Sequence, residues 1–279
     1  MCSSDLWTLA HFLEAGHYAL GFIERYLYPM TAALWSMPPG ELGGFPARTL
    51  IGFMQHHRML TVSGQYQWRT IRGGSNTYLE PITAPFRDRI VTGANITAVT
   101  RSESGVTIDF PDRPSAQFDD VVFACHGNQI LPLLRNPTVL ERDVLGNFTT
   151  TRNEVCLHSD RRLMPKPKDA WASWNYCIGD DGNSTVTYHM NRLQSLDVPE
   201  DYCVSLNANG SVAPDRAIKR LTYYHPVFSK SAVRSQARWA EISGRQRIHY
   251  CGAYWFNGFH EDGARSALRV AEQLGVTWP

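Results

Sequence analysis

The sequence predicts an α/β fold, and three patterns in it indicate this class. Residues 120–125 (DVVFAC) are an almost continuous apolar run of strand length, which is typical of a strand buried on both faces of a sheet. Residues 247–251 form a second strand, which a glycine-bearing loop joins to a helix at 264–274. The first 60 residues instead repeat apolar side chains at helical spacing.

The N-terminal part is predicted to be helical. Apolar residues recur over 7–34 with two glycines and a proline between them, so we expect two helices there. A loop rich in proline and glycine follows, and residues 46–60 are expected to form another helix.

After a glycine pair at 73–74 the pattern changes to short β-branched strands. Strands are expected at 96–100 and 105–110, before the strand at 120–125 and a helix that ends near Arg135. The region 149–225 is rich in aromatic residues, with strands expected at 154–158, 184–190 and 203–207. The last helix, at 264–274, is closed by Gly275.

Composition and charge exclude several classes of function. The 27 Lys and Arg against 26 Asp and Glu leave a net charge of +1, which excludes a global attraction to nucleic acid or to an anionic membrane. No run of about 18 apolar residues lacks a charge, so no transmembrane segment is expected, while peripheral contact with a membrane stays open. The six cysteines stand singly, which favours neither a zinc site nor a disulfide framework and indicates a reducing, cytoplasmic compartment.

The first six residues, MCSSDL, look foreign to the rest of the chain. They match the translation of the end of a common sequencing adapter after a start codon. We therefore expect residues 1–6 to be an assembly artefact and leave them out of the fold.

The strand, loop and helix at the C-terminal end form a platform for an anion or a polar ligand. Free backbone N–H groups and the positive end of the helix dipole converge at the start of such a helix, and Gly263 lets a ligand approach the backbone. Taken alone, such a junction is more often only a tight turn.

Three motifs resemble, in order and spacing, the FAD-dependent amine-oxidase-like flavoproteins: residues 68–75 (WRTIRGGS), 118–124 (FDDVVFA) and 250–268 (YCGAYWFNGFHEDGARSAL). More narrowly, the chain is similar to bacterial predicted NAD/FAD-binding oxidoreductases and to the flavoprotein domain of plant cyclopropane fatty acid synthases. The resemblance covers nearly all of residues 7–275. It implies a Rossmann-like FAD/NAD(P)-binding domain, formed by 73–135 and 244–279, interleaved with an α+β substrate domain, formed by 7–72 and 136–243.

The resemblance implies non-covalent FAD and carries seven cofactor-binding residues over to this chain: Gly73, Gly74, Ile96, Gly252, Ala253, Gly263 and Ala264. The turn at 252–253 matches the contact with the ribityl chain and pyrophosphate, and 263–264 matches a helix start that faces flavin N1 and O2. The glycine pair matches the return of the chain into the FAD domain, and Ile96 matches a residue beside adenine.

The chain departs from the family in one important respect. It has no GxGxxG turn after an N-terminal strand, and no acidic residue about 20 positions later, which are the features that bind a dinucleotide. The family carries both upstream of the point where this sequence begins. We therefore expect a fragment that lacks the first βαβ unit, roughly 30 residues or more, and that binds FAD poorly.

The implied function is FAD-dependent oxidation or desaturation, with hydride transfer from the substrate to flavin N5. The strand that carries a lysine in amine oxidases corresponds to 151–158, which has Arg152 but no lysine, so a fatty acyl or other apolar substrate ranks before an amine. Four residues form a candidate pocket for it: Trp174, Tyr176, Tyr188 and His189. Aromatic clusters of this kind are more often core than pocket.

The sequence leaves one alternative function open and disfavours two others. A catalytically inactive scaffold derived from a flavoprotein is the serious alternative. A metal hydrolase is disfavoured, because the histidines have no metal-ligand spacing, and the helices are wrong for a β-sandwich carbohydrate module. The sequence predicts neither the oligomeric state nor the electron acceptor.

Overall fold

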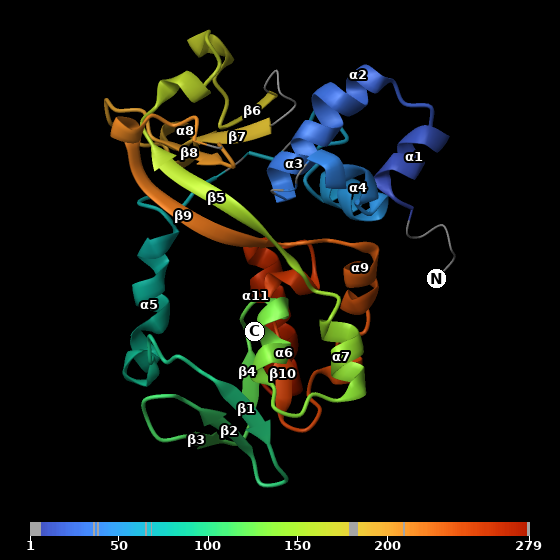
Figure 1. Cartoon of the computed structure of the whole chain (residues 1–279), viewed down its shortest axis with the longest axis vertical. Helices are drawn as coiled ribbons and strands as arrows, with labels where there is room; N and C mark the ends of the chain where they lie inside the picture. Colours follow the sequence, from blue (N-terminus) through green and yellow to red (C-terminus); the bar gives the residue numbers. More distant parts are fainter. Residues whose placement is uncertain are drawn as a thin grey trace.

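The protein is represented by a computed structural model, which describes residues 7–35, 37, 39–64, 66–67, 69–178, 184–208 and 210–277. Residues 1–6, expected to be foreign, and Trp68 of the first motif lie outside the described residues. The described chain forms two parts, each built around its own β-structure (Figure 1).

The lower part in Figure 1 holds two small sheets. Strands β1 (Ala98–Arg101), β2 (Val106–Asp109) and β3 (Ala116–Phe118) form an antiparallel meander. Strands β4 (Val121–Phe123) and β10 (Ile248–Tyr250) pair in parallel, although more than a hundred residues separate them; we call them the parallel pair. The helices of this part are α5 (Leu79–Thr83), α6 (Ile130–Leu133), α7 (Val139–Leu145), α9 (Lys230–Gln236), α10 (Trp239–Ile242) and α11 (His260–Gln273).

The core of this part crosses the domain boundaries that the resemblance implies. One hydrophobic cluster joins the parallel pair and α11 to Val144 and Leu145 of α7, Ala232 of α9 and Trp239 of α10. Packing therefore assigns these helices to the same body as β4 and β10, although residues 136–243 were expected to belong to the other domain.

The upper part is built on a five-stranded antiparallel sheet, the large sheet, with the order β6-β7-β8-β5-β9. Its strands are β5 (Thr150–His158), β6 (Trp174–Ile178), β7 (Ser184–His189), β8 (Cys203–Leu206) and β9 (Ala217–Pro226). Strands β5 and β9 are the longest, and in Figure 1 they run from the upper part down toward α9 and α11.

The N-terminal helices lie beside the large sheet (Figure 1). They are α1 (Leu9–Ala15), α2 (Leu20–Phe22), a π-helical turn (Ile23–Leu27), α3 (Tyr28–Trp35) and α4 (Ala47–His56). A further short helix, α8 (Met190–Gln194), follows β7. No helix among the described residues is both long and apolar enough to cross a membrane.

The two parts meet where the N-terminal helices touch the start of α11. The indole Nε1 of Trp35 donates to the carbonyl oxygen of Asn257 at 3.1 Å. The ring of Phe259, which precedes α11, stacks on Phe53 of α4 with centroids 5.0 Å apart. Tertiary contacts thus fix the position of the α11 N-terminus from both parts.

One sequence expectation about β4 is wrong. A strand buried on both faces was expected at 120–125, but the side chain of Val122 is 41% exposed. The reason is that, among the described residues, β4 has a strand neighbour only on the β10 side. Further apolar residues with exposed side chains lie on and after α5: Leu79, Ile82, Phe86, Ile90 and Val91.

Candidate ligand site at the carboxyl edge of the parallel pair

The carboxyl ends of β4 and β10 lie at one edge, because the two strands are parallel and in register from 121/248 to 123/250. Ligands of open α/β sheets bind at this edge. Cys125 and His126 follow β4 there, and Cys251 and Gly252 follow β10. The helix α11 starts a few residues later in the chain, so its N-terminus belongs to the same place.

Gly252 has a backbone that only glycine accommodates well. Its φ is +144°, and a Cβ added there would lie 2.5 Å from Cε1 of Tyr254. The N–H of Gly252 donates to Oγ of Ser266 at 2.8 Å, and the Ser266 hydroxyl donates to the carbonyl of Gly263 at 2.7 Å. The loop after β10 is therefore fastened to the second turn of α11.

The start of α11 differs from the expectation. The sequence predicts a helix from 264, but the helix begins at His260, because the carboxylate of Asp262 accepts the N–H of Phe259 at 3.0 Å and caps it. The N–H of Gly263 is already donated to the carbonyl of Phe259 at 3.1 Å. The N–H groups without an acceptor inside the helix are those of the first turn, His260, Glu261 and Asp262.

Of the seven cofactor residues carried over by resemblance, the structure brings four together. Ala253 and Gly263 are neighbours, since a Cβ at Gly263 would lie 4.0 Å from that of Ala253 and would meet no other atom within 4 Å. With Gly252 and Ala264 they make one group at the carboxyl edge. Gly73 and Gly74 have φ of +80° and +86° before a 3₁₀ turn (Ser75–Tyr78), and Ile96 lies two residues before β1 with its side chain 41% exposed.

A small hollow joins this edge to the large sheet. It is lined from the parallel pair by His126, Gly127, Asn128 and Tyr254, and from the large sheet by the start of β5 and the end of β9. The amide of Asn128 donates to the hydroxyl of Thr150 at 3.1 Å. Phe228, just after β9, lies 3.0 Å from the position of a Cβ added at Gly258. The near end of the large sheet is thus part of the same site.

Two polar side chains occupy that end of the large sheet. Asn153 of β5 is fully buried, and its amide Nδ2 lies 3.0 Å from Nδ1 of His225 on β9. Burial lowers the pKa of His225, and the nearby His126 lowers it further. From the sequence, His225 is only one of several histidines without metal-ligand spacing, and Asn153 is not predicted to be functional. The signal for Asn153 was an asparagine inside a β-branched run, where that residue is disfavoured.

Three of the four residues of the predicted pocket share a face with this pair. Successive side chains of a strand alternate between faces, and residues paired across strands share one. The register therefore places Trp174, Tyr176 and Tyr188 on the face of Val155 and Asn153. The rings of Trp174 and Tyr188 meet edge to face at 6.3 Å, and the Tyr188 hydroxyl donates to the carbonyl of Ala33 in α3 at 3.2 Å.

His189 does not join the three aromatic residues, which corrects the predicted grouping. It follows Tyr188 directly in β7 and so lies on the opposite face. Its Nε2 lies 3.0 Å from a carboxylate oxygen of Asp201, and its ring meets that of Trp171 at 5.2 Å.

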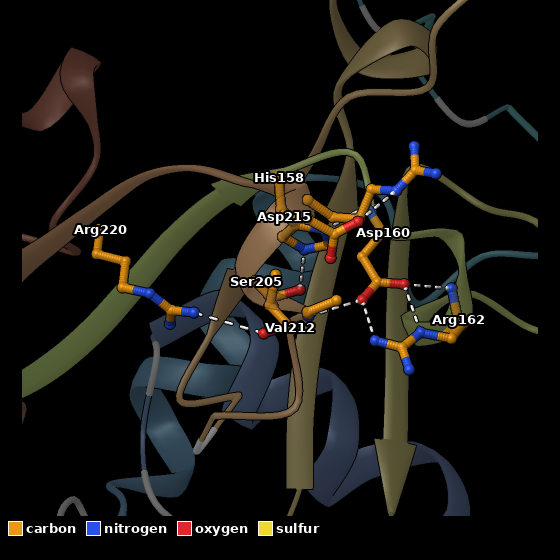
Figure 2. A network of polar contacts seen from close by, with 9 residues as sticks. His158, Asp160, Arg162, Ser205, Val212, Asp215 and Arg220 are labelled. Carbon is orange, nitrogen blue, oxygen red and sulfur yellow. Dashed lines mark hydrogen bonds and ion pairs between the residues drawn. The ribbon is translucent and has the colours of Figure 1, made fainter.

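A buried network on that opposite face contains the residue types of a catalytic triad. Figure 2 shows His158 with Nε2 toward the hydroxyl of Ser205, at 2.8 Å, and Asp160 beside it. The backbone N–H of Asp160 donates to Nδ1 of His158 at 3.0 Å, so the neutral imidazole carries its proton on Nε2 and donates it to Ser205. Burial lowers the pKa of His158 and so favours that neutral form. The ring therefore has no free lone pair with which to activate the serine.

The carboxylate of Asp160 connects two loops of the protein and is not available to bind a substrate. Its carboxylate accepts from Nε and Nη2 of Arg162 and from the N–H of Ala213 at 2.9 Å, contacts that hold its pKa well below the usual range (Figure 2). In the part of the chain that the structure describes, no three His, Cys, Asp or Glu side chains are grouped to hold a metal ion.

No protein-family model matches the sequence, and no curated protein matches it either. Solved structures match its fold. A CLA-producing fatty acid isomerase from P. acnes has a TM-score of 0.66 and 14% identity over 98% of this chain and 67% of that chain. Cyclohexylamine oxidase from Brevibacterium oxydans has a TM-score of 0.65 and 13% identity, over 98% and 69%.

A third structure, reduced UDP-galactopyranose mutase, has a TM-score of 0.63 and 11% identity over 100% of this chain and 70% of that chain. The chain thus has the fold of the FAD-dependent amine-oxidase-like flavoproteins, and the predicted α/β class is confirmed.

Proposed function

We propose that the chain belongs to an FAD-dependent oxidoreductase that binds its flavin non-covalently at the carboxyl edge of the parallel pair. The observation that carries this proposal is the open backbone surface at Gly263, beside Ala253 and the first turn of α11. A planar ring fits against such a surface, because no side chain stands between it and the backbone.

The residues at this edge suit a ring that gains negative charge on reduction. The first-turn N–H groups of α11 and the positive end of its dipole stabilise negative charge placed before the helix. Ser266 keeps the Gly252 loop in position beside that turn. FAD, when bound, supplies the hydride acceptor at N5, and the protein supplies shape and electrostatics.

We propose that the pyrophosphate half of the site needs a βαβ unit with a GxGxxG turn, which the described residues do not contain. Support for this comes from the exposed side chain of Val122 on β4 and from the exposed apolar residues on and after α5. An exposed apolar surface of this kind marks a place where another element packs. Without that unit we expect weak binding of FAD.

An apolar small molecule is the proposed substrate. The face of the large sheet that carries Trp174, Tyr176 and Tyr188 is turned toward α3, and it ends at Asn153 near the carboxyl edge. An amine is the alternative substrate, and a scaffold without activity is the alternative to the enzyme.

The free thiols of Cys125, Cys156, Cys177, Cys203 and Cys251 support a reducing compartment such as the cytoplasm.

Hydrogen exchange of the whole chain with and without excess FAD tests the proposal. We expect FAD to slow amide exchange at 124–128 and 251–264, and ADP-ribose, which lacks the flavin ring, to leave 259–264 unchanged. Equal protection by the two compounds, or protection by FAD elsewhere only, would refute the proposed site.

A further inference from the structure

The hydrogen-bond chain that ends on His225 fixes which ring nitrogen carries the proton. It starts at the backbone, where the N–H of Glu154 donates to Oδ1 of Asn207 at 3.0 Å, so Nδ2 of Asn207 must be the donor to its other partner. That partner is Oδ1 of Asn153, at 2.8 Å.

The orientation of the Asn153 amide follows from this. Its oxygen accepts from Asn207, and its Nδ2 donates to the carbonyl of Thr151 at 3.2 Å. Nδ2 therefore also presents hydrogen to Nδ1 of His225, at 3.0 Å. Nδ1 is an acceptor, so the neutral ring carries its proton on Nε2.

His225 is neutral near pH 7, since burial and His126 both lower its pKa. Its Nε2 donates to none of the described residues and is not among the buried polar atoms without a partner, so it keeps accessible surface. The side chain lies on the face of the large sheet that carries Asn153, the face that also carries Trp174, Tyr176 and Tyr188, whereas Pro226, the next residue in β9, lies on the opposite face.

We infer that His225 is a substrate-binding residue that presents Nε2–H as a fixed, uncharged donor to a carboxylate or carbonyl group of the substrate, with Asn153 as the positioning residue. This inference rests on the proposed function only in calling the ligand a substrate. A donor at this place favours an acid or acyl compound and disfavours an aliphatic amine, because an ammonium group has donors and no acceptor.

Nitrogen-15 NMR of the whole chain without flavin tests the tautomer. At pH 7 we expect a protonated Nε2 and an unprotonated Nδ1 for His225. In N153A the Nδ1 acceptor role is lost and a mixture of tautomers should appear. N128A is the matched control, because Asn128 donates to Thr150 and not to His225, and it should leave the ring unchanged. A protonated Nδ1 in the wild-type chain would overturn the inference.

Ligand binding tests the chemical class. We expect decanoate to shift the Nε2 signal of His225 and to bind about tenfold more weakly to H225L, which corresponds to the loss of one hydrogen bond to a charged group. H225Q keeps an amide donor and should recover most of the affinity. Decylamine should bind the wild type more weakly than decanoate does. Its affinity should be the same for the wild type, H225L and H225Q.

Equal binding of the two ligands to the wild type, or no effect of H225L on decanoate, would overturn the assignment of ligand class. These outcomes are separate from the proposed flavin site. If the chain binds decanoate through His225 but FAD protects no residue at the carboxyl edge, the proposed function fails and this inference stands.

Discussion

The hydroxyl of Ser266 accepts a hydrogen bond from the backbone N–H of Gly252 at 2.8 Å, which joins the end of β10 to α11. The same hydroxyl donates to the carbonyl of Gly263. A strand end, a glycine loop and a helix N-terminus are thus held as one unit before any ligand binds.

Replacing Ser266 with alanine should destabilise the chain. Ser266 is 1% exposed, and S266A leaves the partly buried N–H of Gly252 without its acceptor, at a cost of about 1–3 kcal/mol. Urea unfolding measures the change. The control S104A alters an exposed turn serine and should change the free energy of unfolding by less than about 0.5 kcal/mol. Equal effects of the two substitutions would contradict the role given to Ser266.

Replacing Gly252 with alanine should also destabilise the protein, because the new Cβ would lie 2.5 Å from Cε1 of Tyr254 at a φ of +144°. Overpacking of this kind costs about 1–3 kcal/mol. In a Y254L background the clash is removed, so G252A should cost less there than in the wild type. A double-mutant cycle measures the difference, and strictly additive effects would show that Tyr254 does not limit this position.

The buried carboxylate of Glu141 ties together β1, β10 and the start of α7. It accepts from Arg101 at 2.6 and 2.9 Å, from the hydroxyl of Tyr250 at 2.6 Å and from the N–H of Thr138 at 2.7 Å. E141Q leaves the guanidinium of Arg101, which is 10% exposed, without its counter-ion, and should cost about 3–5 kcal/mol. The control E80Q breaks an exposed pair with Arg87 and should cost less than about 1 kcal/mol.

The ionisation of Glu141 should make the free energy of unfolding depend on pH in a definite direction. Burial raises the pKa of this carboxyl, but the hydrogen bonds from Arg101, Tyr250 and Thr138 outweigh burial and hold it below its ordinary value. Its contribution to stability is present above the unfolded pKa of about 4.3 and is lost as pH falls through the lower folded value. Unfolding measured from pH 6 to 3 should show a smaller loss of stability in E141Q. An unchanged slope would contradict the depressed pKa.

The contact between Trp35 and Asn257 should couple the N-terminal helices to the start of α11. W35F removes the indole donor but keeps an aromatic ring against Phe45 and Phe53. Hydrogen exchange should then speed up together in α3, α4 and residues 256–260. Faster exchange in α3 and α4 alone would show that the two parts are not coupled through this bond.

Local patterns made β4, β10 and the end of α11 predictable, because each depends on a few neighbouring residues. Strand β9 was missed, since its residues 218–220 and 222–224 are exposed and its run carries charged side chains, so no apolar alternation marks it. The start of α11 was missed because the cap is the carboxylate of Asp262 three residues after Phe259, without the usual Ser or Thr before the helix. The pair Asn153 and His225 joins positions 72 residues apart, which only strand register reveals.

The affinity of FAD for G263A tests whether a flavin ring lies against the open backbone at Gly263. Gly263 lies inside α11 with only the Cβ of Ala253 near it, so alanine should raise stability by about 0.5–1 kcal/mol while its methyl group blocks the ring. Gly52 is the matched control, because it lies inside α4 with no atom within 4 Å of an added Cβ. We expect G263A and G52A both to be more stable than the wild type, and only G263A to bind FAD more weakly. Equal affinity of the two variants for FAD would contradict this position of the flavin.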